Sequence, residues 1–90
     1  MSKANVDPVE LRRFAQDLKR TCDELQGLMG SLHGKLRGLE ATWRDQEQRK
    51  FTEAFDQTMK AVANFLINSE EHVKFLNKKA GAVEEYLKQR

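Results

Sequence analysis

LEATWRDQEQ, residues 39–48, lies at the midpoint of a 90-residue chain and interrupts two long runs of heptad-spaced apolar residues. It contains the only tryptophan of the chain, Trp43. Asp45, with Gln48 three residues later, is a pair of the kind that caps the start of a new helix. We therefore predict that this stretch closes a helical hairpin.

The run before this stretch has a clear start. Asp7 can cap free backbone amides, and Pro8 suits the first position of a helix. Phe14 and Leu28 add apolar surface beside two series that recur every seven residues, which makes the apolar face wider than a two-stranded seam requires. The two series are Leu11, Leu18, Leu25, Leu32, Leu39 and Ala15, Cys22, Met29, Leu36, Trp43.

The run after the central stretch has the same organisation. Its face is extended by Phe51, Phe65 and Tyr86, and no alternation of period two indicates a strand. Its two series are Phe55, Val62, Ser69, Leu76, Val83 and Met59, Leu66, Val73, Ala80, Leu87. The sequence predicts an all-α fold: one domain over 1–90, a helix at about 8–42, a turn at 43–45 and a helix at about 46–88.

A hairpin of two helices has no interior, so each broad apolar face stays partly exposed to solvent. Full burial of one leucine-sized side chain contributes roughly 1.5–3 kcal/mol, and a small domain has little net stability to lose. We therefore expect two hairpins to dimerise into a four-helix bundle, either as a homodimer or with a related chain. The predicted core and dimer interface comprises Leu11, Phe14, Leu18, Leu25, Leu28, Leu32, Leu36, Leu39, Met59, Val62, Leu66, Val73, Leu76, Val83 and Leu87.

Composition excludes several classes of protein. Apolar residues make up 39% of the chain and charged residues 33%, which is typical of a folded, soluble helical protein. The formal net charge of +2 is too small to predict nucleic-acid binding, although Arg12, Arg13, Lys19 and Arg20 form a basic patch. A single cysteine excludes an intramolecular disulfide, and no apolar run approaches the ~20 residues of a membrane span. The polar start of the chain predicts no cleavable signal peptide.

The residues also provide no catalytic arrangement. Ser31 and Ser69 lack a neighbouring base, and His33 and His72 are single residues on different helices. Cys22 lies on the apolar face, where a thiol usually serves packing. We predict no enzyme, no cofactor and no metal site. Four glycines interrupt the first helix and are compatible either with a weak stretch facing solvent or with a smooth strip for a partner helix: Gly27, Gly30, Gly34 and Gly38.

Trp43 at the midpoint, followed by Phe51 eight and Phe55 twelve residues later, resembles the WXG100 family of early-secreted-antigen helical hairpins. In that family the tryptophan lies in the hairpin turn. The family's turn reads Trp-x-Gly, whereas Asp45 stands at the third position here. Trp-Arg-Asp followed by Lys50 and Phe51 is similar to a divergent Gram-negative branch of homodimeric four-helix bundles. The family's export signal, Tyr-x-x-x-Asp/Glu, is not expected here, because Arg90 follows Tyr86 at the acidic position.

The resemblance implies a non-enzymatic, dimeric bacterial protein that acts as a type VII-like secretion substrate or as an adaptor for a secreted partner. A secretion ATPase or a larger secreted protein would be its further partner. The expected location is cytoplasmic, or secreted without a cleavable signal peptide. The alternatives are a cytoplasmic coiled-coil scaffold with no role in secretion and, on the basic patch alone, a nucleic-acid-binding protein.

Overall fold

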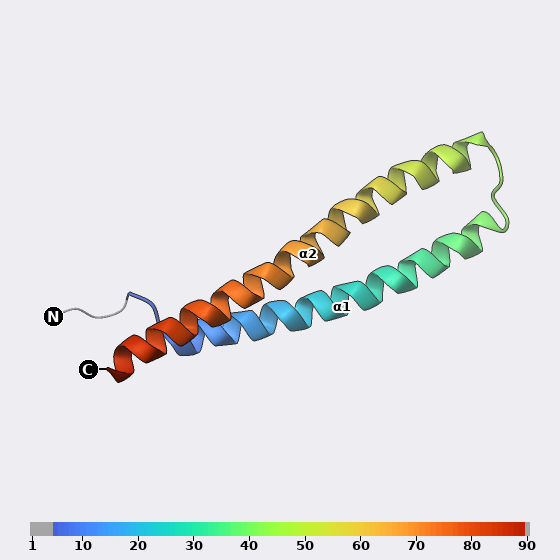
Figure 1. Ribbon diagram of the computed structural model, residues 1–90. Coiled ribbons are helices and arrows are strands. Elements are labelled where there is room, and N and C mark those ends of the chain that lie inside the picture. Colours follow the sequence, from blue (N-terminus) through green and yellow to red (C-terminus); the bar gives the residue numbers. More distant parts are fainter. Residues whose placement is uncertain (1–4, 90) are drawn as a thin grey trace.

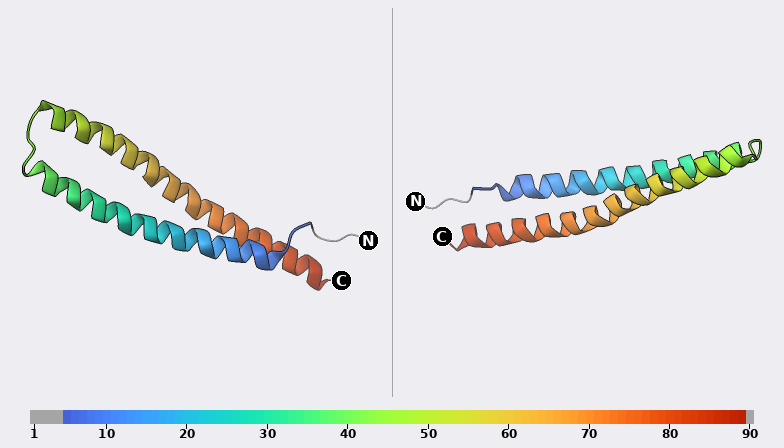
Figure 2. Two further views of the ribbon diagram at one scale, coloured as in Figure 1. Left: turned by 180° about the vertical axis from the view of Figure 1, so that it is seen from behind. Right: turned by 90° about the horizontal axis from the view of Figure 1, so that it is seen from above.

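The computed structural model describes residues 5–89, and within them the chain forms two helices and no strand. Helix α1 spans Pro8–Glu40 and helix α2 spans Gln46–Lys88. The helices run antiparallel, with the connecting segment 41–45 at one end of the rod (Figure 1). The molecule measures 68 × 17 × 14 Å, and the further views show the helices winding gently around each other (Figure 2). The predicted all-α hairpin is confirmed.

Both helices begin at an aspartate, as their sequences predict. The carboxylate of Asp7 accepts a hydrogen bond from the backbone N–H of Val9 at 2.9 Å, and Pro8 occupies the first helical position. The carboxylate of Asp45 accepts one from the backbone N–H of Gln48 at 2.8 Å. Each side chain satisfies an amide that has no partner within its helix, which fixes where the helix starts.

Helix α1 ends at Glu40, two residues before the position expected from the sequence. The carbonyl of Leu39 accepts the backbone N–H of Thr42 at 3.1 Å and that of Trp43 at 3.0 Å. It also accepts the Thr42 hydroxyl at 3.2 Å. The bond from Trp43 is a last regular helical bond, and the bond from the Thr42 backbone spans only three residues, which tightens the final turn. No residue between 5 and 89 has a positive φ, so this turn does not require a glycine.

A half-buried hydrogen-bond network ties the end of α1 to the start of α2. The hydroxyl of Thr52 donates to the carboxylate of Glu40 at 2.7 Å. The side-chain amide of Gln48 donates to the same carboxylate oxygen at 3.1 Å and to the Thr52 hydroxyl at 2.8 Å. The sequence suggested Gln48 only as a partner of the Asp45 cap, but its side chain holds Glu40. These polar side chains at the start of α2 thus hold the end of α1 in place and close the hairpin.

Three aromatic rings form a row next to the turn, with a tilted pair followed by a stacked pair. The ring centroids of Trp43 and Phe51 lie 5.9 Å apart, and those of Phe51 and Phe55 lie 5.8 Å apart. Such separations are typical of favourable aromatic pairs. Trp43 itself is half-buried. The tryptophan therefore covers the end of the hairpin rather than filling a closed core.

The contact between the helices is a single narrow seam. Few apolar residues are buried: Ala15, Leu36, Ala80 and Val83. Most other apolar positions of the predicted heptads are half-buried, whereas Leu32, Leu39 and Leu87 are exposed. The half-buried residues are Leu11, Leu18, Cys22, Leu25 and Met29 on α1, with Phe55, Met59, Val62, Leu66, Val73 and Leu76 on α2. Spacing that alternates between three and four residues keeps one line of each helix facing the other.

One ion pair joins the two helices beside the seam. The Arg12 guanidinium donates from Nε and Nη2 to the two carboxylate oxygens of Glu84, at 2.9 and 2.7 Å. These hydrogen bonds lower the pKa of Glu84 and raise the pKa of Arg12. A β-carbon added at Gly81 would lie 3.8 Å from Arg12 Nη2, so the guanidinium lies directly over this part of α2.

The lowered pKa of Glu84 gives a prediction with a definite sign. The pair stabilises the hairpin while Glu84 is ionised, and this contribution is lost as the pH falls below the ordinary glutamate value of 4.5. Glu84→Gln is therefore expected to lower the melting temperature at neutral pH, and the difference from the parent chain should shrink on acidification. Glu85→Gln is the control, since Glu85 makes no ion pair in residues 5–89. A gap between the parent chain and Glu84→Gln that is independent of pH would contradict this account.

Trp43→Ala tests the aromatic row at the turn. The substitution removes the ring that contacts Phe51, and we expect it to lower the free energy of unfolding by about 1–3 kcal/mol, less than a fully buried tryptophan would lose. Chemical denaturation at fixed protein concentration measures this change. Trp43→Phe keeps an aromatic ring and should recover most of the loss. Unchanged stability in Trp43→Ala would show that the tryptophan does not support the fold.

Candidate functional site

The seam divides the hairpin into two sides that differ in chemistry. In a helix of 3.6 residues per turn, the residue one position after a seam residue lies on one flank, and the residue three positions after lies on the other. In two antiparallel helices that face each other, residues that follow their own seam residues by the same number of positions lie on the same side of the hairpin. Arg12 and Glu84 each follow a seam residue by one position and contact each other, as this geometry requires.

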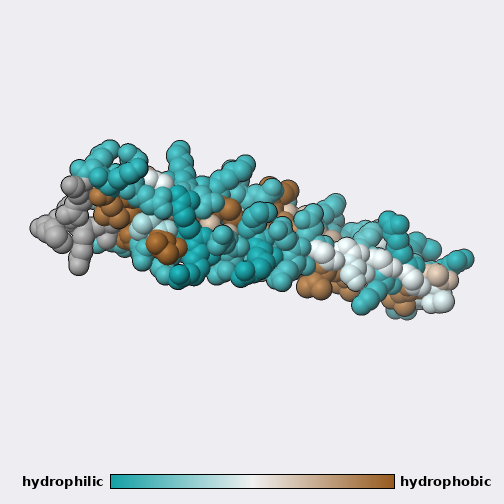
Figure 3. All heavy atoms as spheres, turned by 90° about the horizontal axis from the view of Figure 1, so that it is seen from below, coloured by the Kyte–Doolittle hydropathy of each residue, from teal (hydrophilic) through white to brown (hydrophobic). Residues whose placement is uncertain are grey.

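The apolar side is the flank three positions after the seam, together with the column next to it. It carries large apolar side chains that remain exposed to solvent in the single hairpin: Phe14 is 59%, Leu28 68%, Phe65 48% and Phe75 66% exposed. Figure 3 likewise shows patches of hydrophobic residues exposed on a mostly hydrophilic surface. We define the apolar side by six residues: Phe14, Leu28, Phe51, Phe65, Phe75 and Tyr86.

Helix α2 contributes four of these six residues and also small ones beside them. Ala54, Ala61 and Ala82 lie in the same helical column as Phe75. Small side chains allow another backbone to approach closely, while the phenylalanines offer large apolar area. The centre of the hairpin is also uncharged, since neither 25–34 nor 61–69 contains Asp, Glu, Lys or Arg. The apolar side therefore has the composition of a helix-packing surface.

The polar side is the flank one position after the seam. It carries the Arg12–Glu84 pair and a groove between the helices near Cys22 and Ser69. Glu40 of the turn network lies on the same side, one position after Leu39. Ile67 is the exposed large apolar residue next to the groove, at 59% exposure. Contacts between polar side chains of the two helices thus occur on the side away from the apolar surface.

The residues predicted from the sequence as core and interface fall into two groups. Ten lie on the seam, buried or half-buried: Leu11, Leu18, Leu25, Leu36, Met59, Val62, Leu66, Val73, Leu76 and Val83. Five are exposed in the hairpin: Phe14, Leu28, Leu32, Leu39 and Leu87. The first group holds the hairpin together. The second group is available for contacts with another chain.

Sequence reasoning did not identify the network of Glu40, Gln48 and Thr52. A signal for it was present, because Gln48 and Thr52 continue the heptad series of Phe55 and Met59 toward the turn. Polar residues at seam positions require partners when they are covered. Gln48 and Thr52 are hydrogen-bonded to each other, and both also donate to the Glu40 carboxylate at the end of α1.

Other predicted features have simple placements. His33 lies on the polar side and His72 on the apolar side, and no group of three or more metal-binding side chains occurs among the described residues. Over the same residues, neither helix is long and apolar enough to cross a membrane. A β-carbon built on any of the glycines of α1 would meet nothing within 4 Å, so these glycines serve no packing within the hairpin: Gly27, Gly30, Gly34 and Gly38.

Comparisons with known proteins agree with this architecture. The model of the WXG100 family, described as proteins of 100 residues with WXG, matches residues 3–86. The crystal structure of the secreted protein EsxB from Bacillus anthracis is similar, with a TM-score of 0.81 and 28% identity over 92% of this chain and 89% of that one. A selenomethionine-labelled EsxB structure gives a TM-score of 0.79 and 27% identity over 96% and 98%. No curated protein matches the chain in sequence.

The turn explains how the chain can differ from the family's motif and still fold as its members do. The family's Trp-x-Gly becomes Trp43-Arg44-Asp45, and Asp45 has an extended backbone with φ −123° while its side chain caps α2. Helix capping by aspartate thus takes the place of glycine. Together, the hairpin, the tryptophan at its turn and a match over residues 3–86 show that the chain belongs to the WXG100 family.

Proposed function

We propose that this hairpin is a dimeric, non-enzymatic member of its family that serves as a substrate of specialised, type VII-like secretion or as an adaptor for a secreted partner. The observation that carries the proposal is the apolar side: large hydrophobic residues from both helices on one flank, about half exposed in a single hairpin. Membership of the WXG100 family and the likeness to a secreted protein of Bacillus anthracis support the role in secretion.

Energetics favour a second hairpin as the occupant of the apolar side. Burying the remaining half of six large apolar side chains contributes roughly 5–9 kcal/mol per hairpin. This gain is comparable to the whole net stability of a small domain. Part of it offsets the loss of motional freedom on association. We infer that the chain packs through its apolar side into a four-helix bundle, with a second copy or a related hairpin.

In this proposal the turn end remains free. The row of Trp43, Phe51 and Phe55 lies at the turn end of the hairpin, opposite the start of α1 and the end of α2. A secretion ATPase or a larger secreted protein would then meet the bundle at a turn or at the chain ends. Because Arg90 occupies the position where the family's export signal has an acid, the proposal includes a partner chain that supplies the signal.

Phe65→Asp tests the role of the apolar side. The new carboxylate would have to be buried in the bundle without a partner, so we expect a shift from dimer to monomer. Ile67→Asp is the matched control, because Ile67 is also exposed but lies on the polar side and should leave the dimer intact. Sedimentation velocity over a dilution series measures both. A parent chain that is monomeric at micromolar concentration, or a dimer lost equally in both variants, would refute the interface.

The secretion role is tested in the native bacterium. We expect the chain in the culture fluid of parent cells and its loss from that fluid when the FtsK/SpoIIIE-type ATPase of the secretion system is deleted. A cytosolic marker protein controls for lysis. If the chain stays inside cells whose secretion system is active, the role as an exported protein is wrong and the cytoplasmic scaffold becomes the better account.

A further inference from the structure

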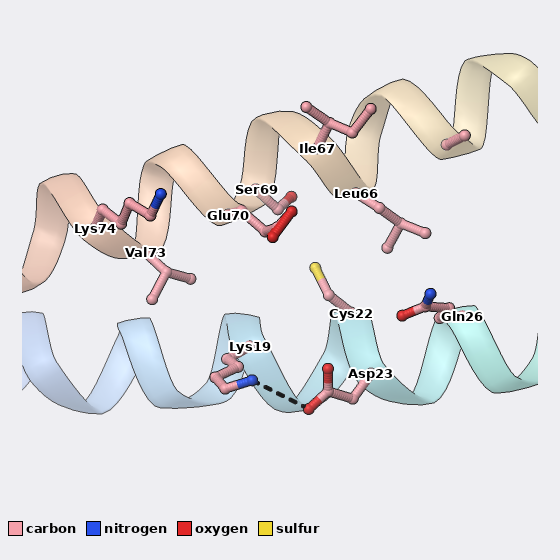
Figure 4. Close-up of a pocket in the computed structure, with 11 residues that line it drawn as sticks. Lys19, Cys22, Asp23, Gln26, Leu66, Ile67, Ser69, Glu70, Val73 and Lys74 are labelled. Atoms are coloured by element: carbon pink, nitrogen blue, oxygen red, sulfur yellow. Dashed lines mark ion pairs between the residues drawn. The ribbon is translucent and has the colours of Figure 1, made fainter.

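A groove of about 530 Å³ opens between the helices on the polar side. Leu66 and Val73 of α2 and Cys22 of α1 form its apolar lining. Figure 4 shows these three side chains directed into the space between the helices, with the Glu70 carboxylate at the same gap. Because the groove lies away from the apolar side, dimerisation through that side leaves it open.

One polar group at the groove has no partner. Ser69 is 1% exposed, and its hydroxyl oxygen makes no hydrogen bond. A buried hydroxyl without a partner is costly, so a ligand that satisfies it gains affinity. Ser69 also occupies a seam position that is apolar in the neighbouring heptads, at Val62 and Leu76. At Ser69 the seam therefore has a buried hydroxyl without a hydrogen bond, where the neighbouring heptads have apolar side chains.

Two lysines line the groove, and each of them has a carboxylate as its ion-pair partner. Lys19 pairs with Asp23 at 3.5 Å, and Lys74 pairs with Glu71 at 3.4 Å. Glu70 lines the groove, and the ion pairs among residues 5–89 do not include it. The groove thus combines apolar walls with a free carboxylate, an orphaned hydroxyl and the side-chain amide of Gln26. These groups suit a ligand with an apolar stem and a cationic head.

We propose that the groove is a binding site for a lysine side chain of a partner protein. The aliphatic stem would lie against Leu66 and Val73, since lysine stems cover apolar surface while the head stays polar. The ammonium would donate to the Glu70 carboxylate and to Ser69 Oγ, which turns toward the groove by rotation about its Cα–Cβ bond. Lysine suits this site better than arginine does. The compact ammonium has three donors that can reach acceptors on different side chains, whereas the planar guanidinium of arginine suits a single carboxylate.

The probe for this site is Nα-acetyl-lysine N-methylamide, titrated into the ¹⁵N-labelled full-length chain and followed by two-dimensional NMR. We expect saturable shifts confined to residues 19–26 and 63–74, with a dissociation constant on the order of 1 mM for so small a probe. The norleucine analogue, which has the stem without the ammonium, should bind far more weakly.

Two variants test the assigned roles. Glu70→Gln should weaken binding of the lysine probe by about tenfold, as loss of a hydrogen bond to a charged group does. Asp56→Asn is the matched control, because Asp56 occupies the same helical position two heptads earlier, and it should leave binding unchanged. Ser69→Ala should weaken binding by about threefold.

Several results would overturn the proposal: no saturable shift, equal binding of the norleucine analogue, or a Glu70→Gln variant that binds the lysine probe as tightly as the parent chain. Translational diffusion measured on the same samples reports whether the chain is a dimer. A monomer that still binds the probe in the groove would contradict the dimer interface and leave the lysine site standing, so the two proposals fail separately.

Discussion

Two helices lying side by side hide only one strip of each from water, and the other features of this molecule follow from that constraint. The seam buries Ala15, Leu36, Ala80 and Val83, and most of the other apolar heptad residues are only half-buried or exposed. The apolar faces in the sequence are wider than the seam, so phenylalanines remain exposed on one flank. The hairpin thus has capped helix starts and a hydrogen-bonded turn, but its hydrophobic burial is incomplete. That imbalance is the physical basis for assembly with another hairpin.

The turn shows how the family's architecture tolerates a changed motif. The Leu39 carbonyl accepts three donors in the last turn of α1, and the Asp45 side chain caps the start of α2. Neither task requires a positive φ, so glycine is dispensable. The row from Trp43 to Phe55 and the network around Glu40 then cover the space that the turn leaves. Sequence variation at the third motif position is therefore compatible with an unchanged fold.

Much of this could be predicted from the sequence, because heptad spacing and capping residues act locally. The series from Leu11 and from Phe55 predicted the two helices and their seam, and Asp7 and Asp45 predicted the helix starts. The network of Glu40, Gln48 and Thr52 depends on the alignment of one helix against the other, and local patterns do not determine that alignment. The same holds for the groove: Cys22 and Ser69 were assigned to apolar faces, but only the paired helices bring them to one cavity.

The central claim is that one flank of the hairpin is covered by another chain while the opposite flank stays open. Hydroxyl-radical footprinting with mass spectrometry, performed over a range of protein concentrations, tests this most directly because it reports the exposure of individual side chains. The account predicts that Phe14, Phe65 and Phe75 become protected as concentration rises, while Ile67 keeps the same reactivity. Oxidation of the three phenylalanines that does not change with protein concentration would contradict it.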